Sequence, residues 1–339
     1  MATTGRVLVI YTGGTLGMVE TDQGWAPGAD LDGWLRELVA RELPGVAFEL
    51  VSLEPLIDSS NARPQEWQRI VDAVESRADE FDAFVVLHGT DTLGFSAAAV
   101  HFALRGTGRT VVLTGAQRSL VLPDSDAPAN VSGAIRAALH PRVSGVSIYF
   151  DRTLVAGHHA TKISSEDDHA FDSVNLPPLA TMTHNGRLVV RDIEPAASMA
   201  GGAPTPGPRK PYRPVDLVVL TLHPGLQASR VRSLLTPAPE AVVLRAYGTG
   251  NAPDDDPELL DALQQANDAG TVLVVTTQCP HGGVHLGRYA VSQGLLSVGA
   301  VSGGDFTSDA LVAWVTDLLS QGLSPEQVRE AIKQQTHTH

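Results

Sequence analysis

Short apolar runs rich in β-branched residues alternate with stretches of helical periodicity along the first half of the chain. Such runs are typical of buried strands, and apolar residues at i, i+3, i+4 and i+7 indicate a helix with one apolar face. The pattern predicts strands over Arg6–Tyr11, Val46–Leu53, Ala83–Leu87, Thr110–Leu113 and Val143–Phe150. It predicts helices over Leu31–Leu38 (capped by Asp30), Pro64–Val74, Ala97–Leu104 and Ala129–Leu139. This order implies a mostly parallel sheet with helices on both faces.

A proline- and glycine-rich stretch over residues 195–214 interrupts the alternation, and we interpret it as a linker. Beyond it the pattern predicts strands over Leu217–Leu222, Ala241–Ala246 and Thr271–Thr276. It also predicts helices over Leu226–Leu235, Pro257–Asp268, Asp309–Ser320 and Pro325–Lys333. We therefore expect an α/β protein with a larger N-terminal domain over residues 1–194 and a smaller α/β C-terminal domain over residues 215–339.

Two of the predicted strands end in similar glycine turns. Arg6–Tyr11 runs into Thr12-Gly13-Gly14-Thr15, and Ala83–Leu87 runs into His88-Gly89-Thr90-Asp91-Thr92. Ligands of open α/β sheets bind at the carboxyl ends of the strands, and glycine lets the backbone pass close to a ligand. Two such turns can present two hydroxyls and a carboxylate to one small substrate, which suits nucleophilic catalysis. The alternative is a pair of tight turns whose threonines bond to their own backbone.

Neither turn matches a nucleotide-binding motif. The segment Gly13–Gly17 lacks the lysine of GxxxxGK[ST] and fails the GxGxxG spacing, so we expect no nicotinamide, flavin or other cofactor. Histidines occur at His158-His159, Glu166–His169, His281 and His285, all in predicted loops. None has the i, i+4 pairing of an HExxH helix, and we expect no metal site.

Overall charge narrows the range of partners. The 339-residue chain has a formal net charge of −14, which argues against a nucleic-acid or anionic membrane surface. One cysteine, Cys279, permits no intrachain disulfide and fits a reducing compartment; we expect it to be a small buried residue. The first apolar run, Val7–Tyr11, is too short for a signal peptide or a membrane span. We therefore expect a cytoplasmic protein without nucleic-acid or membrane partners.

Two segments carry a resemblance to a known family. Tyr11–Met18 (YTGGTLGM) and Leu87–Ala97 (LHGTDTLGFSA) resemble the signature segments of the bacterial L-asparaginase family. Segments similar to its type I, cytoplasmic branch follow in the expected order: Leu56–Asn61 (LIDSSN), Thr114–Gln117 (TGAQ), Thr161–Lys162 (TK), Leu244–Pro253 (LRAYGTGNAP) and Thr277–Cys279 (TQC). The resemblance implies hydrolysis of L-asparagine to L-aspartate and ammonia by a homodimer or homotetramer without a metal.

The resemblance also implies a role for each matching catalytic position. Thr15 would be the nucleophile that attacks the side-chain carboxamide and forms an acyl-enzyme. Thr90, Asp91 and Lys162 would form a second hydroxyl–carboxylate–ammonium group that tunes proton transfer. A free threonine hydroxyl is a weak nucleophile, so some base must take the proton of Thr15.

Further positions are implied to bind substrate or effector. Ser59 and Asp91, with Ser60 beside them, would hold the α-carboxylate and α-ammonium groups, and Asn251 would contribute to the site of a neighbouring subunit. For both serines the alternative is a turn and helix cap before Pro64. Some type I members have an allosteric asparagine site. Thr161, Arg245 and Cys279 resemble part of that site.

One position departs from the family pattern. In the family, a tyrosine in the flexible loop after the first signature supplies a hydroxyl near the nucleophile. The matching place here holds Trp25, whose indole only donates hydrogen bonds. Thr15 would then be activated by Tyr11, Thr12 or a water held by Lys162, or the enzyme is slow or acts on a different amide. Alternatively the loop aligns differently, and Trp25 covers the pocket as a lid.

Three functions are compatible with these residues. The first is an asparaginase. The second is a glutaminase, another amidohydrolase or the amide-cleaving subunit of a tRNA-dependent amidotransferase, the last disfavoured by the acidic charge. The third is a non-catalytic amino-acid sensor, disfavoured because Thr15, Thr90, Asp91 and Lys162 are all present.

Overall fold

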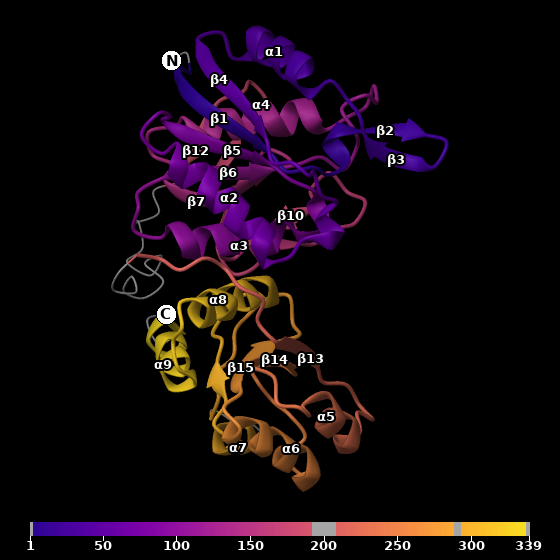
Figure 1. Cartoon of the computed structure of the whole chain (residues 1–339), viewed down its shortest axis with the longest axis vertical. Coiled ribbons are helices and arrows are strands. Elements are labelled where there is room, and N and C mark those ends of the chain that lie inside the picture. Colours follow the sequence, from indigo (N-terminus) through magenta and orange to yellow (C-terminus); the bar gives the residue numbers. More distant parts are fainter. Residues whose placement is uncertain (1–2, 192–207, 288–292, 337–339) are drawn as a thin grey trace. The chain divides into compact units, whose positions relative to one another are not determined.

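The computed structural model describes residues 3–191, 208–287 and 293–336, which fall into two units, Met1–Glu194 and Pro195–His339 (Figure 1). Residues 195–207 of the predicted linker lie outside the described residues, and the linker stays a prediction. Its last part, residues 208–214, has no helix or strand and is tied to the second unit. Arg209 pairs with Asp317 at 2.9 Å, and the backbone N–H of Lys210 donates to Gln321 Oε1 at 2.8 Å.

One eight-stranded sheet organises the first unit, in the order β12-β11-β8-β7-β6-β5-β1-β4. The strands β4, β1, β5, β6 and β7 are parallel, and the other three extend the sheet in antiparallel fashion. The bounds are β1 Gly5–Tyr11, β4 Val46–Ser52, β5 Ala83–Leu87, β6 Thr110–Thr114, β7 Gly145–Phe150, β8 Thr153–Ala156, β11 Ala180–Met182 and β12 Leu188–Val190. The fold class and the parallel strands are confirmed. The short antiparallel strands went unpredicted because none contains a long apolar run.

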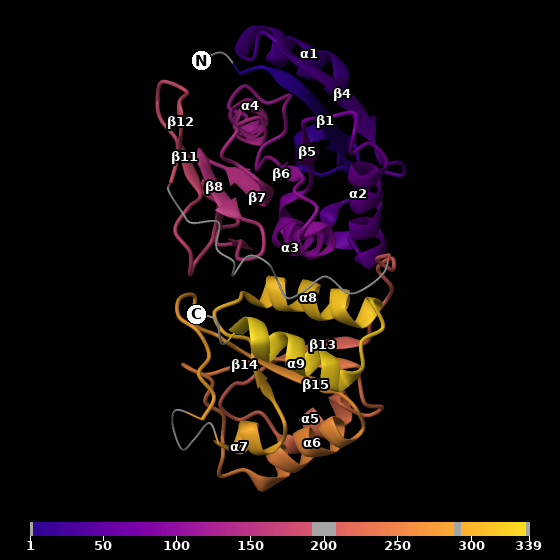
Figure 2. The same cartoon turned by 90° about the vertical axis from the view of Figure 1, so that its left-hand side faces the viewer.

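Helices cover both faces of this sheet (Figure 2). Helices α1 Leu31–Glu42 and α4 Ala127–Ala138 pack on the face that carries Val7 and Val9. Helices α2 Pro64–Ser76 and α3 Leu93–Leu104 pack on each other, and α3 contacts β6 and β7. Leu8 and Ile10, which point to the opposite face from Val7 and Val9, are also fully buried. Burial on both faces explains why the strand reads as a continuous apolar run.

Most predicted boundaries in the first unit hold within a few residues. Asp30 caps α1 as expected, accepting a hydrogen bond from the backbone N–H of Gly33, and Pro64 opens α2. Helix α3 begins at Leu93 rather than Ala97, because the 3-10 turn η3 Thr90–Thr92 leads directly into it. The glycine turn after β5 is therefore continuous with a helix.

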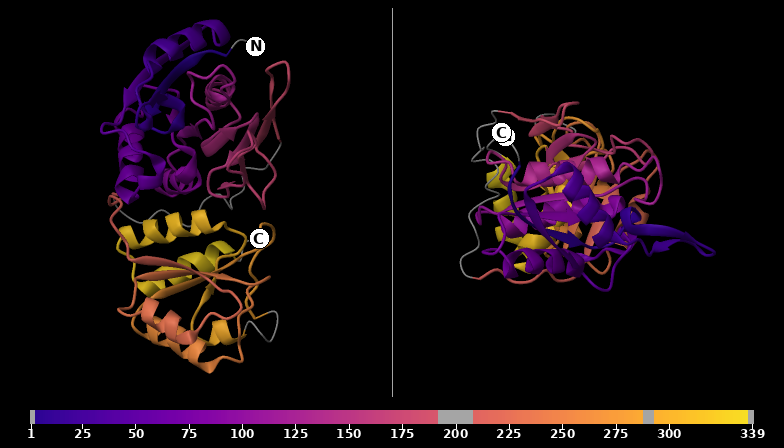
Figure 3. Two further views of the ribbon diagram at one scale, coloured as in Figure 1. Left: turned by 90° about the vertical axis from the view of Figure 1, so that its right-hand side faces the viewer. Right: turned by 90° about the horizontal axis from the view of Figure 1, so that it is seen from above.

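The second unit is a smaller α/β domain with a parallel four-stranded sheet in the order β13-β14-β15-β16. Its strands are β13 Leu217–Thr221, β14 Ala241–Ala246, β15 Val272–Thr277 and β16 Val301–Ser302. Its helices are α5 Ala228–Leu234, α6 Pro257–Asp268, α7 Gln293–Ser297, α8 Ser308–Ser320 and α9 Pro325–Thr336. In the left view of Figure 3 the orange helices α5 and α6 and the yellow helices α8 and α9 cover opposite faces of the sheet. The predicted strands and helices are confirmed, whereas the short α7 and β16 were not predicted.

Two small strand pairs complete the first unit. Strands β2 Met18–Thr21 and β3 Gly24–Pro27 form an antiparallel hairpin that projects from the unit (Figure 1). Strands β9 Thr161–Lys162 and β10 Phe171–Asp172 form a second antiparallel pair. Among the described residues, no helix has the length and apolar character needed to cross a membrane.

Candidate active site

The turns that follow β1, β4 and β5 lie against one another. These strands are neighbours and parallel, so their carboxyl ends emerge at the same edge of the sheet. A Cβ atom built on Gly14 would lie 2.4 Å from Gly89 Cα, and one built on Gly89 would lie 2.5 Å from Ser59 Oγ. The tertiary structure therefore brings both glycine turns of the sequence, and Ser59, into one place.

Gly14 cannot be replaced without moving one turn away from the other. Its φ of 95° is a conformation that side chains disfavour, and its Cβ would meet the backbone of Gly89. We expect Gly14→Ala to lower the free energy of unfolding by about 2–4 kcal/mol, the sum of backbone strain and overpacking. The measurement is chemical denaturation.

Gly24 supplies a matched control for this substitution. Gly24 has a similar φ of 106°, but a Cβ atom there would meet nothing within 4 Å. Gly24→Ala therefore carries the backbone strain alone, and we expect a loss of about 1–2 kcal/mol. Equal losses in the two variants would show that the turns do not press on each other at Gly14.

Lys162 joins the second turn from a distant part of the chain. Its Nζ donates to Thr90 Oγ1 at 2.9 Å and contacts Asp91 Oδ1 at 2.8 Å. Thr90 is buried, the Lys162 side chain is 21% exposed, and the Asp91 side chain is 60% exposed. A hydroxyl oxygen that accepts from an ammonium group keeps its own proton available for donation. The three side chains thus form a hydroxyl–ammonium–carboxylate group that reaches from the interior to the surface.

Thr15 opens the short helix η1 Thr15–Gly17, directly after the turn that touches Gly89. Within the described part of the chain, its half-buried hydroxyl makes no hydrogen bond. Nearby, the Thr12 hydroxyl donates to the Leu87 carbonyl oxygen at 3.1 Å. Thr15 is therefore the hydroxyl of the first turn that is left uncommitted.

Tyr11 packs beneath this turn. A Cβ atom on Gly17 would lie 2.2 Å from the Tyr11 hydroxyl, which is buried and has no hydrogen-bond partner among the described residues. Burial, with a smaller contribution from Glu54, raises the pKa of Tyr11 to about 12. Tyr11 therefore stays protonated near neutral pH and is available as a donor.

Ser59 and Ser60 differ sharply in their surroundings. Ser59 is buried, and its carbonyl oxygen accepts from Thr92 Oγ1 at 2.8 Å, whereas Ser60 is exposed. The cap of this turn is Asp58, whose carboxylate accepts from the Ser60 backbone N–H at 3.1 Å. The residue at the N-cap of α2 is Arg63. Neither serine side chain caps a helix. The Ser59 hydroxyl therefore does not have the capping role that was the alternative to substrate binding.

Trp25 lies in the projecting hairpin, opposite Glu20. Its side chain is 46% exposed, which is unusual for an indole. The β2–β3 hairpin therefore carries Trp25, the predicted lid residue. That Trp25 closes over Thr15 stays a prediction.

The remaining predicted residues divide between the units. Thr161 is on β9 of the first unit, next to Lys162. In the second unit, Arg245 lies on β14 with its Nε buried and unpaired among the described residues, and the buried Oδ1 of Asn251 is likewise unpaired. Cys279 is exposed, so its prediction as a buried residue was wrong. Strand β15 ends at Thr277, which leaves Cys279 in the loop beyond it.

His88 was not singled out from the sequence, yet it is the first residue of the second turn and bonds to the turn's backbone. Its Nδ1 is 2.7 Å from the Gly89 carbonyl oxygen, and its Nε2 is 3.0 Å from Ser96 Oγ. Burial lowers the pKa of His88, so the ring is neutral near neutral pH. The only signal in the sequence was a polar residue between a buried strand and a glycine.

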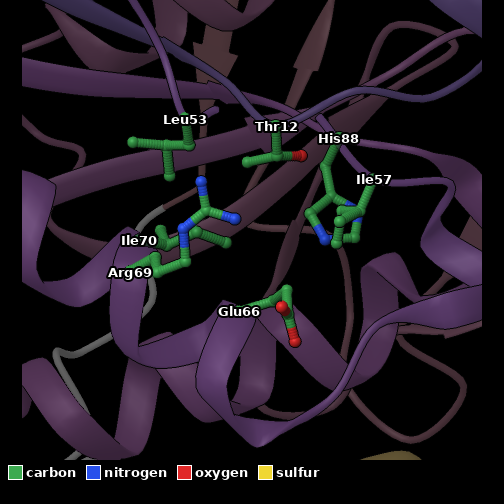
Figure 4. A pocket seen from close by; sticks show the side chains of 7 residues that line it. All are labelled: Thr12, Leu53, Ile57, Glu66, Arg69, Ile70 and His88. Carbon is green, nitrogen blue, oxygen red and sulfur yellow. The ribbon is translucent and has the colours of Figure 1, made fainter. Parts of the chain in front are cut away.

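A small hollow borders the His88 ring. It is lined by Thr12, Leu53, Ile57, Glu66, Arg69, Ile70 and His88 (Figure 4). Its volume of about 10 Å³ is at the lower limit for a single water molecule. This hollow is therefore too small to hold an amino acid. Across the described ranges, no three His, Cys, Asp or Glu side chains are grouped in a way that could hold a metal ion.

Family models match both parts of the chain. The model described as "Asparaginase, N-terminal" matches residues 6–194, and the model described as "Glutaminase/Asparaginase C-terminal domain" matches residues 216–332. L-asparaginase 1 of Escherichia coli (strain K12) is 36% identical over 336 residues, covering 97% of this chain and 96% of the relative. Together these matches span nearly the whole chain.

Solved structures agree with the sequence comparison. The crystal structure of L-asparaginase I from Vibrio cholerae O1 matches with a TM-score of 0.85 and 31% identity, covering 98% of this chain and 97% of that one. The thermostable L-asparaginase from Thermococcus kodakarensis matches with a TM-score of 0.84 and 30% identity, covering 96% of each chain. Both α/β units are included in these matches.

Proposed function

The chain belongs to the asparaginase family of amidohydrolases, and from that premise we propose that it hydrolyses L-asparagine to L-aspartate and ammonia through an acyl-enzyme on Thr15. The observation that carries this proposal is the junction of Lys162 with Thr90 and Asp91, on a turn that lies against the turn bearing Thr15. If the two glycine turns had only a structural role, they would not require a lysine from 71 residues away in the sequence.

Acylation begins when Thr15 Oγ1 attacks the carbonyl carbon of the substrate's side-chain amide. The C–N bond then breaks, and the Thr15 hydroxyl proton ends on the departing nitrogen, which leaves as ammonia. Backbone N–H groups of the turns around Thr15 and Thr90 stabilise the oxyanion of the tetrahedral intermediate. The product of this half-reaction is an aspartyl ester of Thr15.

Deacylation requires water at the same carbon. Water held near Thr90 and Lys162 attacks the ester, the bond to Thr15 Oγ1 breaks, and the proton lost by water ends on Thr15. The Lys162 ammonium keeps the Thr90 oxygen occupied as an acceptor, so the Thr90 hydroxyl orients its proton toward the reacting groups. Asp91 balances the ammonium charge and offers its exposed carboxylate to the substrate's α-ammonium group, while Ser59 binds the α-carboxylate.

Three groups are candidates for activating Thr15 in the absence of the family's loop tyrosine: Tyr11, Thr12 and a water held by Lys162. The pKa of the Tyr11 hydroxyl is raised to about 12, so this group stays protonated near neutral pH and does not accept the proton of Thr15. The Thr12 hydroxyl is committed to the Leu87 carbonyl oxygen. A water held by Lys162 is therefore the route that we favour, with Trp25 closing over the site to exclude other solvent.

Assembly and regulation follow the same premise. We propose a cytoplasmic homodimer or homotetramer in which Asn251 contributes to the active site of a neighbouring subunit. A second asparagine site would use Thr161, Arg245 and Cys279. The exposure of Cys279 leaves its thiol accessible to such an effector.

We expect purified protein to release ammonia from L-asparagine with a higher kcat/KM than from L-glutamine. A single methylene changes binding in an apolar pocket by only about 10–200-fold, so some activity on glutamine is expected. Competing measurements of kcat/KM on the two amino acids provide the test, and a sigmoidal dependence on asparagine would support the second site.

Each alternative function has its own outcome in this experiment. A higher kcat/KM for glutamine would make the protein a glutaminase on the same fold. Calorimetric binding of asparagine without ammonia release, at high protein concentration, would identify a sensor. Ammonia release from neither amino acid, with no binding of either, would contradict the proposed function.

A further inference from the structure

His88 holds the carbonyl group of the peptide that links Gly89 to Thr90. The ring is 2% exposed, and its two nitrogens have different partners: Gly89 O at 2.7 Å and Ser96 Oγ at 3.0 Å. Ser96 is fully buried on α3, the helix that continues from the turn. The imidazole thus bridges the turn to the helix behind it.

The partners determine where the proton resides. A carbonyl oxygen can only accept, so Nδ1 carries the hydrogen and donates to Gly89. In a neutral imidazole Nε2 is then an acceptor, and it receives the Ser96 hydroxyl proton. Ser96 therefore selects the tautomer that can hold the Gly89 carbonyl group. Without Ser96, the proton could move to Nε2 and leave two acceptors facing each other at the turn.

Holding this carbonyl group also orients the next N–H group. The Gly89–Thr90 peptide is trans, so the Thr90 N–H points to the opposite side from the carbonyl oxygen. The carbonyl side is occupied by the buried ring, and the small hollow beyond it has no room for a substrate. The Thr90 N–H therefore faces away from His88. A Cβ atom on Gly14 would meet Gly89 Cα, Gly89 N and the His88 carbonyl carbon, so the Thr15 turn lies against the peptide that directly precedes this one.

A hollow of about 10 Å³ borders the ring, so packing is incomplete on that side, and the two hydrogen bonds add to what holds the ring in place. Figure 4 shows the His88 side chain at the wall of the hollow, among Thr12, Ile57 and Glu66. The neighbouring charged groups are bonded elsewhere: Glu66 Oε2 accepts from the Arg63 backbone N–H, and Arg69 donates to the Glu54 and Pro55 carbonyl oxygens. The hydrogen-bond partners of the imidazole are therefore Gly89 and Ser96.

We propose that His88, with its tautomer set by Ser96, is a positioning residue that orients the Thr90 N–H for stabilisation of the oxyanion. This inference rests on the proposed amide hydrolysis and gives a role to His88, which is not one of the reacting groups. His88 touches no reacting atom, and it acts through the peptide that it holds. Its loss should therefore lower kcat, since the oxyanion forms only in the transition state, and should leave KM nearly unchanged.

Two amide substitutions separate this role from simple packing. The amide nitrogen of asparagine stands three bonds from Cα, as Nδ1 does, whereas that of glutamine stands four bonds away, as Nε2 does. His88→Asn therefore keeps a donor for Gly89, and His88→Gln loses it. We expect kcat of His88→Gln to fall by about 10²-fold, the typical effect of losing one oxyanion-hole donor, with KM changed by less than about 3-fold. We expect His88→Asn to keep kcat within about 10-fold of the wild type, because misplacement is smaller when the donor remains.

Ser96→Ala is the milder companion variant, and thermal unfolding is measured for all three. It removes only the hydroxyl that selects the tautomer, and we expect kcat to fall by about 10-fold at unchanged KM, part of the effect of losing an oxyanion donor. Equal kcat values for the Asn and Gln variants would overturn the proposal. If both His88 variants fail to fold, wild-type kcat in Ser96→Ala would overturn it. Absence of ammonia release from the wild-type protein would overturn the proposed function itself, and the role of His88 with it.

Discussion

Thr15→Ala is expected to lower kcat on L-asparagine by about 10³-fold or more, by analogy with the removal of nucleophiles from other acyl-transfer enzymes. The physical reason is that no other hydroxyl of the first turn is free to form the ester. Thr12 is bonded to the Leu87 carbonyl oxygen, and the Thr15 hydroxyl makes no hydrogen bond within the described residues. Steady-state ammonia release gives the measurement.

Two further substitutions at this position isolate the hydroxyl from the shape of the side chain. Thr15→Val keeps the branched shape without the hydroxyl and should be as inactive as the alanine variant. Thr15→Ser keeps the hydroxyl and should retain much more activity than either. Normal turnover by Thr15→Val would remove Thr15 from the nucleophile role. Since Thr15 makes no side-chain hydrogen bond, all three variants should unfold close to the wild-type temperature.

Lys162→Met is expected to lower kcat by about 10²–10³-fold while changing the free energy of unfolding by less than about 1 kcal/mol. The catalytic loss follows from removing the cation that bonds to Thr90 Oγ1 and balances Asp91. The stability change is small because the Asp91 carboxylate is 60% exposed, and exposed ion pairs contribute little to stability. The split between activity and stability is therefore the signature of a catalytic role.

Lys333 on α9 provides the matched control, because it is an exposed lysine in the second unit. Lys333→Met makes the same chemical change and should leave both kcat and stability close to wild type. A mild effect of Lys162→Met on kcat, similar to that of Lys333→Met, would mean that Lys162 has no catalytic role.

The apolar pattern was most informative where strands are buried on both faces. The strand Arg6–Tyr11 was predicted from a continuous apolar run and is observed as β1, between β5 and β4, because neither of its faces leaves room for polar residues. The antiparallel edge strands were missed for the opposite reason. Strand β12 Leu188–Val190 is short and partly exposed, so its pairing with β11 leaves little trace in composition.

Helix caps were predictable because their chemistry is local. Asp30 caps α1 and Asp256 caps α6 through hydrogen bonds to backbone N–H groups three residues ahead. The hairpin that carries Trp25 was not predicted, since its two strands are mostly exposed and lack an apolar alternation. The burial of Cys279 was predicted wrongly because composition describes the average cysteine and not its position beyond the end of a strand.

The sequence by itself determined the family, the α/β class and the residue types that the chemistry needs: threonine hydroxyls after buried strands, a carboxylate and a lysine. These are properties of short segments, where apolar periodicity and glycine turns act over a few residues. Only the tertiary structure decided which of them meet. Lys162 reaches Thr90 across 72 positions, and the imidazole of His88 selects one partner on each side. Such contacts depend on how parallel strands and crossing helices bring distant residues to one edge of a sheet, and no local pattern encodes that distance.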